Sequence, residues 1–513
     1  MPASRDSPPV HTRAATAALA AVALAWLAAA LVVPLFPDEY YYWTWSQHLA
    51  AGYFDHPPAV AWLIGAGTTL FGTTPFGVRA FTLGCGLLTL TAVGRLAARL
   101  AGPAALPRAM LLFAVTPLIT GAFVLATPDA PLLAATTWSL YAILRALEAD
   151  TTPRQALGWW SMAGVLLGVA GLSKYTAVLV PAALAVTVAL NRPLRRVLAT
   201  PGPYVAAVLA LVVVSPVVAW NAGHGWVSFR YQLSHGLGAP RGGSLLDREV
   251  TMVSQQLLAA TPIVFGFLVA AVWRTLRRRA DPRAVLLGGV ALCVALFFAW
   301  SGRRRPVEAN WLALAYPAAT VLLASWPLAP LAARWLRAGA WLSAALTLVL
   351  LTHLATPLLP LPREPLATSQ AFGWSAVGSA VERAAAASRG DGTLHFATNR
   401  YQDAAAVSFL LPTHPPVYAF NLNSRRNQYD LWPQFPDVAR PGDRMLLLLN
   451  EDGSDPQAVL GLLAPHFASI EQGELVERRM PALDGQGEMF NRKRIWLLSG
   501  WRGSWPDEAR RGR

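Results

Sequence analysis

Long apolar segments recur along the first two thirds of the chain and predict helices that cross a lipid bilayer. Residues 14–36 are nearly all apolar. They exceed the apolar core of a cleaved signal peptide and reach the roughly 20 residues that span a bilayer, which indicates a signal anchor. Hydropathy predicts about eleven spans in all. The further segments fall near 77–100, 106–127, 131–147, 157–173, 175–190, 203–220, 255–273, 283–300, 309–327 and 338–356.

Arginines concentrate in every second connection between these segments, and this sets the expected orientation. Short cytoplasmic loops carry an excess of Lys and Arg. The N-terminus and the basic loops are therefore expected in the cytoplasm, with loops 36–75 and 221–254 on the outer face. The basic loops contain Arg95, Arg99 and Arg108, then Arg145 and Arg154, then Arg192, Arg195 and Arg196, then Arg274, Arg277, Arg278, Arg279 and Arg283, and finally Arg334 and Arg337.

The pattern changes after Pro357, where prolines 360, 362 and 365 suggest a linker and polar sequence follows. Apolar runs at 394–398, 416–420, 444–450 and 494–500 predict short strands, and helical patterns lie near 371–387, 401–411 and 456–467. Alternating strands and helices predict a small α/β domain. The expected fold is mostly α, a polytopic transmembrane domain over residues 1–356 with a soluble periplasmic α/β domain over residues 357–513.

Composition narrows the function classes. Only 14% of residues are charged, against about 25% in ordinary soluble domains. The net charge of +14 is mostly explained by loop topology and forms no single basic face, so nucleic-acid binding is not expected. Cys85 and Cys293 lie inside apolar spans, where packing is the simpler interpretation. Nucleotide-binding glycine loops and zinc-hydrolase motifs are absent from the sequence, so no nucleotide cofactor is expected.

Ionisable residues gather at the outer ends of separate predicted spans. A single carboxylate at a span end is ordinary, because capping and snorkelling residues are common there. Asp38 follows Pro37, and its alternative to a functional role is a structural one as a helix cap. The aromatic run at 40–45 is open to two interpretations, an interfacial belt or the lining of a sugar pocket. The clustered residues are Asp38, Asp55, His56, Asp129, Lys174 and Glu308.

Cations on the outer face point to an anionic partner. Lys174 lies between two apolar runs and cannot easily reach the cytoplasmic surface, so its expected partner is an acidic side chain or a phosphate. Arg303, Arg304 and Arg305 stand on the predicted outer face, where the positive-inside rule disfavours them. Because this placement is unfavourable, it suggests that the arginines bind an anionic ligand, and a phosphate is the natural candidate.

Several motifs together resemble a known family. They are FPDEYYYWTWSQHLAAGYFDHPP from residue 36, FGVRAF at 76–81, TPDAPLLAATTWSLYAI at 127–143, GLSKYTAVLVP at 171–181, WNAGHGWVSFRYQ at 220–232 and EANWLALAYPA at 308–318. They resemble bacterial membrane glycosyltransferases of the protein O-mannosyltransferase and aminoarabinose (lipid A) transferase type, in the glycosyltransferase C (GT-C) superfamily and similar to glycosyltransferase family 39. The tail from Asn399 to Trp432 also looks like the soluble tail of one bacterial branch.

The resemblance implies an inverting transferase that takes a hexose or pentose from a polyprenyl-phosphate donor. Its site would face the periplasm of a bacterial inner membrane, and its acceptor would be lipid A, another envelope glycan or a protein. The sugar stays open between a hexose, a uronic acid and an aminopentose. Asp38 matches the catalytic aspartate and Lys174 a lysine that meets the donor phosphate. Asp55 matches a metal-associated acid, which leaves open a divalent metal ion, and His56 stands where the aminoarabinose branch has lysine.

The remaining expected site residues extend these roles. We expect Glu39 beside Asp38 as a second catalytic acid, and Arg79 with Arg303 to Arg305 as ligands of the donor phosphate. The expected substrate-binding residues are Tyr40, Tyr42, His56, Asp129, Glu308 and Asn310.

The chemistry of these side chains suits glycosyl transfer. A carboxylate such as Asp38 can take the proton of an acceptor hydroxyl during attack, and the ionised phosphate leaving group needs cations. The rival class is a transporter or flippase for a lipid or small solute, which many spans would also suit. Transporters place polar groups near the bilayer midplane, whereas here they gather at one surface.

Overall fold

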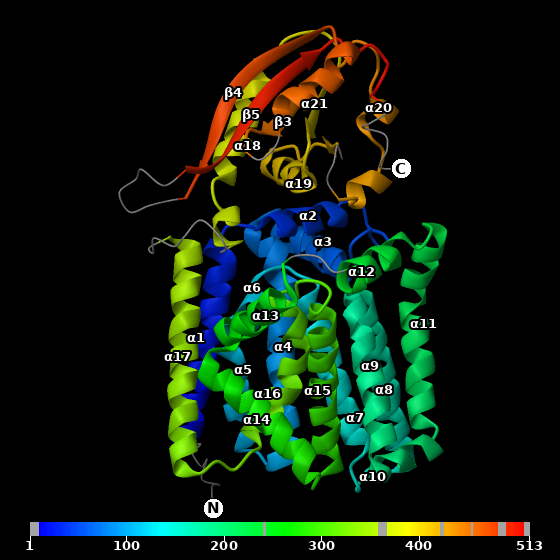
Figure 1. The fold of residues 1–513 in the computed structure, drawn as a ribbon, viewed down its shortest axis with the longest axis vertical. Coiled ribbons are helices and arrows are strands. Elements are labelled where there is room, and N and C mark those ends of the chain that lie inside the picture. Colours follow the sequence, from blue (N-terminus) through cyan, green and yellow to red (C-terminus); the bar gives the residue numbers. More distant parts are fainter. Residues whose placement is uncertain are drawn as a thin grey trace, which may run out of the picture.

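The computed structural model describes residues 10–239, 243–357, 367–420, 425–452, 455–480 and 489–506. A bundle of helices occupies one end of the molecule and a sheet with its helices the other, with α2 (Pro37–Ser46) between them (Figure 1). This confirms the expected fold class, mostly helical with a C-terminal mixed domain. The proline-rich segment expected as a linker falls in residues 358–366, outside the described residues.

The helical part runs from α1 to α17 and contains three short 3-10 helices. Its elements after α2 are connected by short loops and several begin with proline, whose fixed φ suits the first helical turn. The bounds are α1 Val10–Val32, α3 Ala59–Phe71, α4 Pro75–Ala101, α5 Ala105–Ala114, α6 Pro117–Val124, α7 Asp129–Ala146, α8 Pro153–Ser173, η1 Tyr175–Val178, α9 Leu179–Leu190, α10 Arg192–Arg195, η2 Arg196–Ala199, α11 Gly202–Gly223, α12 Val227–Leu237, α13 Leu245–Ala260, α14 Pro262–Arg278, α15 Pro282–Gly302, η3 Ala309–Ala315, α16 Tyr316–Ala324 and α17 Pro330–Ala355.

Within the described residues, six helices are long and apolar enough to cross a membrane. The number reaches nine if each of three sharply bent helix pairs counts as one span. The expected count of about eleven exceeds this range, because two of the expected segments are not among these candidate spans. Segment 131–147 folds as α7, which buries Thr136, Thr137 and Ser139 inside the bundle. Segment 309–327 begins as a 3-10 helix and continues as the nine-residue α16, also buried.

A sharp bend divides the expected span at 255–273. α13 ends at Ala260 and α14 begins at Pro262, and their axes differ by 103°. Thr261 between them has a φ of 62°, which a β-branched residue rarely adopts. Proline cannot continue the preceding helix, so the chain turns here.

The described residues from 367 to 506, which the sequence leads us to expect as a soluble domain and which are called the soluble part below, form a five-stranded sheet with helices on its faces. The strand order is β2-β1-β3-β5-β4; β1 pairs in parallel with β2 and β3, and β5 pairs antiparallel with β3 and β4. Four strands lie where apolar runs predict them. β4 was missed because most of its side chains are exposed and polar. The bounds are β1 Leu394–Thr398, β2 Val417–Ala419, β3 Arg444–Asn450, β4 Ser469–Arg479 and β5 Met489–Ser499, with η4 Ala367–Ala371, α18 Trp374–Ala387, α19 Tyr401–Leu410, η5 Gln428–Leu431, α20 Phe435–Val438, α21 Pro456–Leu463 and η6 Ala464–His466.

The aromatic run of α2 joins the two parts. Tyr40 and Trp43 pack edge-on against Phe409 of α19, with ring centroids 5.2 and 5.0 Å apart. Tyr41 packs against Tyr401 at 4.5 Å. These rings are buried in a core shared with the soluble part. They therefore do not form an exposed interfacial belt, and α2 is held as a rigid layer between bundle and sheet.

Candidate active site

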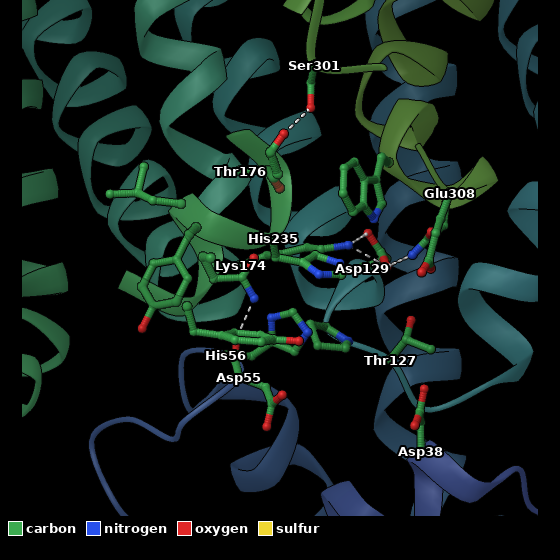
Figure 2. Close-up of a pocket in the computed structure, with 18 of the residues that line it drawn as sticks. Asp38, Asp55, His56, Thr127, Asp129, Lys174, Thr176, His235, Ser301 and Glu308 are labelled. Atoms are coloured by element: carbon green, nitrogen blue, oxygen red, sulfur yellow. Dashed lines mark hydrogen bonds and ion pairs between the residues drawn. The ribbon is translucent and has the colours of Figure 1, made fainter. Parts of the chain in front are cut away.

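A cavity of about 790 Å³ opens where the helical bundle meets the soluble part. Its wall comes from the start of α2, the loop before α3, the loop before α7, η1, α12, the segment from α15 to η3, and the soluble part (Figure 2). Several of the span-end residues expected to converge do so here. The polar lining residues are Asp38, Tyr41, Tyr42, Asp55, His56, Thr127, Asp129, Lys174, Tyr175, Thr176, Tyr231, Gln232, His235, Ser301, Glu308, Asn310, Gln370, Tyr401, Gln402 and Arg425.

Asp38 faces this cavity from the second position of α2. It does not cap the helix: Phe36 is the cap residue, and its N–H donates to Glu39 Oε2 at 3.0 Å. Within the described ranges the Asp38 carboxylate takes part in no hydrogen bond or ion pair, and its side chain is exposed to the cavity. The carboxyl nevertheless lies deep below the protein surface, and this desolvation raises the pKa of Asp38 to about 6; Arg425 lowers that pKa, and Asp55, Glu308 and Glu39 raise it further. Such a carboxyl exchanges a proton near neutral pH.

Glu39 lies beside Asp38 in sequence but points away from the cavity. It forms a buried ion pair with Arg79 of α4, with Arg79 Nη2 2.5 Å from Glu39 Oε2. The remaining Arg79 donors bond Val33 O at 2.6 Å and Pro34 O at 2.9 Å, and the Ala126 N–H donates to Glu39 Oε1 at 2.9 Å. Arg79 is wholly buried. This pair fixes the end of α1, the start of α2 and the segment before α7, and neither side chain lines the cavity.

Asp129 and Lys174 form the second buried pair, and these two do line the cavity. Lys174 Nζ donates to both carboxylate oxygens of Asp129, at 2.8 and 3.0 Å. Asn310 Nδ2 donates to Asp129 Oδ2 at 2.8 Å. Asp129 opens α7, Lys174 stands between α8 and η1, and Asn310 is in η3. Three separate elements are thereby joined, and the ammonium is oriented at the cavity wall.

Asp55 is held by the third pair, which involves the soluble part. Arg425 Nη1 lies 2.5 Å from Asp55 Oδ1, and the Tyr41 hydroxyl donates to Asp55 Oδ2 at 2.7 Å. Gln232 of α12 donates to the Asp55 carbonyl at 2.6 Å. The Gln428 N–H in turn donates to the Tyr41 hydroxyl at 2.6 Å. Asp55 is buried by these contacts, whereas the Arg425 side chain stays 41% exposed.

These contacts bear on the metal ion that the sequence leaves open at Asp55. Both Asp55 oxygens already have partners, Tyr41 and Arg425. In the part of the chain that the structure describes, no group of three or more His, Cys, Asp or Glu side chains is arranged to hold a metal ion. The residues present do not fit a divalent ion at Asp55, because a cation there would have to displace the Arg425 guanidinium.

His56 is the neighbour of Asp55 and lines the same cavity. Burial lowers its pKa well below the usual value, and the charges of Lys174, Arg425 and His235 lower it further. Its Nδ1 is buried and, among the described residues, has no hydrogen-bond partner. The imidazole is therefore neutral, with a ring nitrogen available to a hydroxyl of a bound molecule.

The other expected residues divide between the cavity and its surroundings. Tyr42 lines the cavity, whereas Tyr40 packs into the aromatic core. Glu308 lines it with an exposed carboxylate. The arginine triplet follows α15 outside the lining: Arg304 stacks on Trp300, and Arg303 offers its carbonyl to Arg248.

Arg425 and its neighbours were missed from sequence as site residues. Arg425 lies 370 residues from Asp55 along the chain. The expected tail motif contains Tyr401, Gln402 and Arg425, but without a role. Their placement depends on how the soluble part docks, for which no periodic pattern gives a signal.

The geometry has known counterparts. Residues 55–220 match the family model described as dolichyl-phosphate-mannose-protein mannosyltransferase. Over 290 residues the chain is 28% identical to the lipid A galacturonosyltransferase RgtD of Rhizobium johnstonii, covering 56% of this chain and 59% of that protein.

Solved structures share the fold over most of this chain. ArnT from Cupriavidus metallidurans bound to undecaprenyl phosphate aligns with a TM-score of 0.68 and 16% identity over 96% of this chain and 99% of ArnT. The archaeal oligosaccharyltransferase AglB from Archaeoglobus fulgidus, in complex with an inhibitory peptide and a dolichol-phosphate, aligns with a TM-score of 0.54 and 12% identity over 94% of this chain and 74% of AglB. The resemblance drawn from the sequence motifs is thus confirmed, and the chain has the fold of the GT-C membrane glycosyltransferases.

Proposed function

We propose that this protein is an inverting glycosyltransferase that moves a sugar from a polyprenyl-phosphate donor to an acceptor at the membrane surface. The observation that carries the proposal is the state of Asp38, a carboxylate with no side-chain partner in the described ranges, facing a cavity of about 790 Å³ with a pKa of about 6. Two cations, Lys174 and Arg425, line the same cavity. A base and cations in one enclosed site suit attack on a glycosyl phosphate.

The reaction balances with these residues alone. The acceptor oxygen forms a bond to the anomeric carbon while the bond from that carbon to the phosphate oxygen breaks. Asp38 takes the acceptor proton, and the electron pair of the broken bond leaves with the polyprenyl phosphate. Lys174 stabilises the charge that gathers on the leaving phosphate, and neutral His56 holds a sugar hydroxyl.

Glu39 and Arg79 act in this scheme as positioning residues. Their buried pair fixes the first turn of α2, which carries Asp38. A reacting group must be held within a fraction of an ångström of its productive geometry, and a pair with several backbone partners provides that rigidity. The triplet Arg303 to Arg305 stands outside the cavity lining, so it has no role in binding the donor phosphate in this scheme.

The proposed location is a bacterial inner membrane with the site on the periplasmic face. The arginine-rich helix α10 lies at the end of the bundle remote from the soluble part, as the positive-inside rule requires if that end is cytoplasmic (Figure 1). The relative named for lipid A supports lipid A as the acceptor, with other envelope glycans and proteins as alternatives. Its galacturonosyl sugar is a uronic acid, one of the three sugar classes that the sequence leaves open.

Transfer is tested with purified full-length protein in nanodiscs, a labelled lipid A acceptor and undecaprenyl-phosphate-linked sugars. The proposal expects labelled product with wild type and a loss of at least about 1,000-fold with Asp38→Asn, because the base is removed while shape is kept. Asp247→Asn is the matched control, since Asp247 lies on the surface, where it accepts a hydrogen bond from the N–H of Ser244, the cap residue of α13. Equal rates for wild type and Asp38→Asn contradict the proposal.

A further inference from the structure

The soluble part contributes a distinct section of the cavity wall. Its four lining residues come from three places, η4 (Gln370), the start of α19 (Tyr401 and Gln402) and the segment before η5 (Arg425). Amides, a phenol and a guanidinium are groups that bind hydroxyls and carboxylates. The bundle side supplies Asp38, Asp129 and Lys174. The reacting groups and the polar groups of the soluble part therefore meet at one cavity from different sides.

Arg425 is held in a defined orientation. Its guanidinium lies over the rings of Tyr231 and Tyr401, 5.2 and 4.9 Å from their centroids. Nη2 donates to the Tyr401 hydroxyl at 2.6 Å and Nη1 to Asp55. A guanidinium stacked on aromatic rings keeps its plane fixed, and its fork of donors matches a carboxylate better than a point charge does. With 41% of the side chain exposed, another acceptor can reach it.

The two lysine and arginine side chains that line the cavity come from different parts of the molecule. Lys174 belongs to the bundle and Arg425 to the soluble part, and His56 lies within electrostatic reach of both. Each cation has its own acid, Asp129 for Lys174 and Asp55 for Arg425. A donor whose phosphate lies at Lys174 uses only one of them. A second, oriented cation in the same cavity is suited to a second negative charge on the donor. Since the phosphate is already bound at Lys174, that second charge would be on the sugar.

We propose that Arg425 is a specificity-determining residue that binds a carboxylate on the donor sugar, so that the enzyme takes a uronic acid in preference to a neutral hexose. This inference rests on the proposed function, which places the donor phosphate at Lys174. The sugar carboxylate approaches the exposed edge of the guanidinium and accepts hydrogen bonds from its N–H groups, beside Asp55 and Tyr401, which accept from Nη1 and Nη2. The soluble domain thereby selects the sugar, and the bundle carries out the transfer.

The rival explanation is that Arg425 only fastens the soluble part to the bundle. Other contacts already do this. Tyr40 and Trp43 pack on Phe409, and the Gln428 N–H bonds the Tyr41 hydroxyl. Loss of the Arg425 charge is therefore expected to leave the two parts docked. A fastening role would weaken every donor equally, whereas a selecting role weakens only acidic ones.

The test measures binding by wild type, Arg425→Gln and Arg425→Lys, each as full-length protein in nanodiscs. The three probes are undecaprenyl phosphate, undecaprenyl-phosphate galacturonic acid and undecaprenyl-phosphate galactose. The neighbour Arg426 lies over Phe54 outside the cavity lining, so Arg426→Gln is the matched control. Intrinsic tryptophan fluorescence reports affinity, and thermal unfolding reports folding.

Wild type and Arg426→Gln are expected to prefer the uronic acid donor over the galactose donor. Arg425→Gln is expected to lose about 10- to 100-fold in affinity for the acid alone, the range for hydrogen bonds to a charged group. Arg425→Lys is expected to fall between them, because the charge remains without the fork. Equal losses for both sugar donors, weaker binding of undecaprenyl phosphate itself, or no wild-type preference for the acid overturns the inference. Selective binding of the acid without transfer keeps the inference and contradicts the proposed function.

Discussion

The pH dependence of transfer follows from the raised pKa of Asp38. Its carboxyl must be ionised to accept the acceptor proton, so activity rises with pH through the pKa and levels off above it. With a pKa of about 6, about nine tenths of the carboxyl is ionised at pH 7 and about one tenth at pH 5, so kcat/KM falls about tenfold between them. An unshifted aspartate, at 3.8, would keep full activity over this range.

The assay measures kcat/KM for sugar transfer from pH 5 to pH 8 in nanodiscs, with thermal unfolding followed at each pH to separate inactivation from titration. The donor phosphate is a diester and does not titrate here. His56 has a pKa well below its usual value and adds no step near neutral pH.

Two variants are expected to shift the rising part of the pH–activity profile, called the limb below, in opposite directions. Burial is the main cause of the raised pKa of Asp38, Arg425 lowers it and Glu308 raises it. Arg425→Gln is expected to shift the limb to higher pH, and Glu308→Gln to lower pH. A flat profile from pH 5 to pH 7 in folded protein, or shifts of the opposite sign, would refute the assignment of Asp38 as the base.

Three further predictions concern the groups around Asp38. Glu39→Ala leaves the buried Arg79 charge without its partner and is expected to cost about 3–5 kcal/mol of stability, measured by thermal unfolding, with Glu39→Gln intermediate because an amide can still accept one bond. Trp43→Ala removes a fully buried ring between α2 and α19 and is expected to cost about 3–5 kcal/mol, seen as faster proteolytic release of the soluble domain; unchanged release would count against the shared core. Lys174→Met is expected to lower affinity for undecaprenyl phosphate by at least about tenfold, while adding Asp129→Asn restores stability without restoring that affinity; recovered binding in the double variant would show that Lys174 serves only Asp129.

The convergence of the span-end residues could be predicted because helix ends on one side of a bilayer share one surface. The positions of the apolar segments and the distribution of positive charge among the loops were enough to group Asp38, Asp55, Asp129 and Lys174. Their division into pairs could not be predicted, since it depends on side-chain geometry. Glu39, adjacent to Asp38, points to a different side of α2 because successive helix positions point in directions about 100° apart.

Other differences arise where tertiary contacts override local pattern. Pro262 gave a local signal for the bend between α13 and α14, but hydropathy alone runs through it. β4 carries few apolar residues because it is an edge strand with one exposed face. Arg425 reaches Asp55 across 370 residues through docking of two separately patterned parts, so no spacing in the sequence joins them.

The central claim is that this chain transfers a sugar from a lipid phosphate with Asp38 as the base. Mass spectrometry of envelope lipids from cells without the chain, complemented by wild type or by Asp38→Asn, tests it most directly. The account predicts one glycan mass that disappears without the chain and returns only with wild type, and that mass difference equals a uronic acid residue. Restoration of the mass by Asp38→Asn, with both proteins present at equal levels in the membrane, would contradict it.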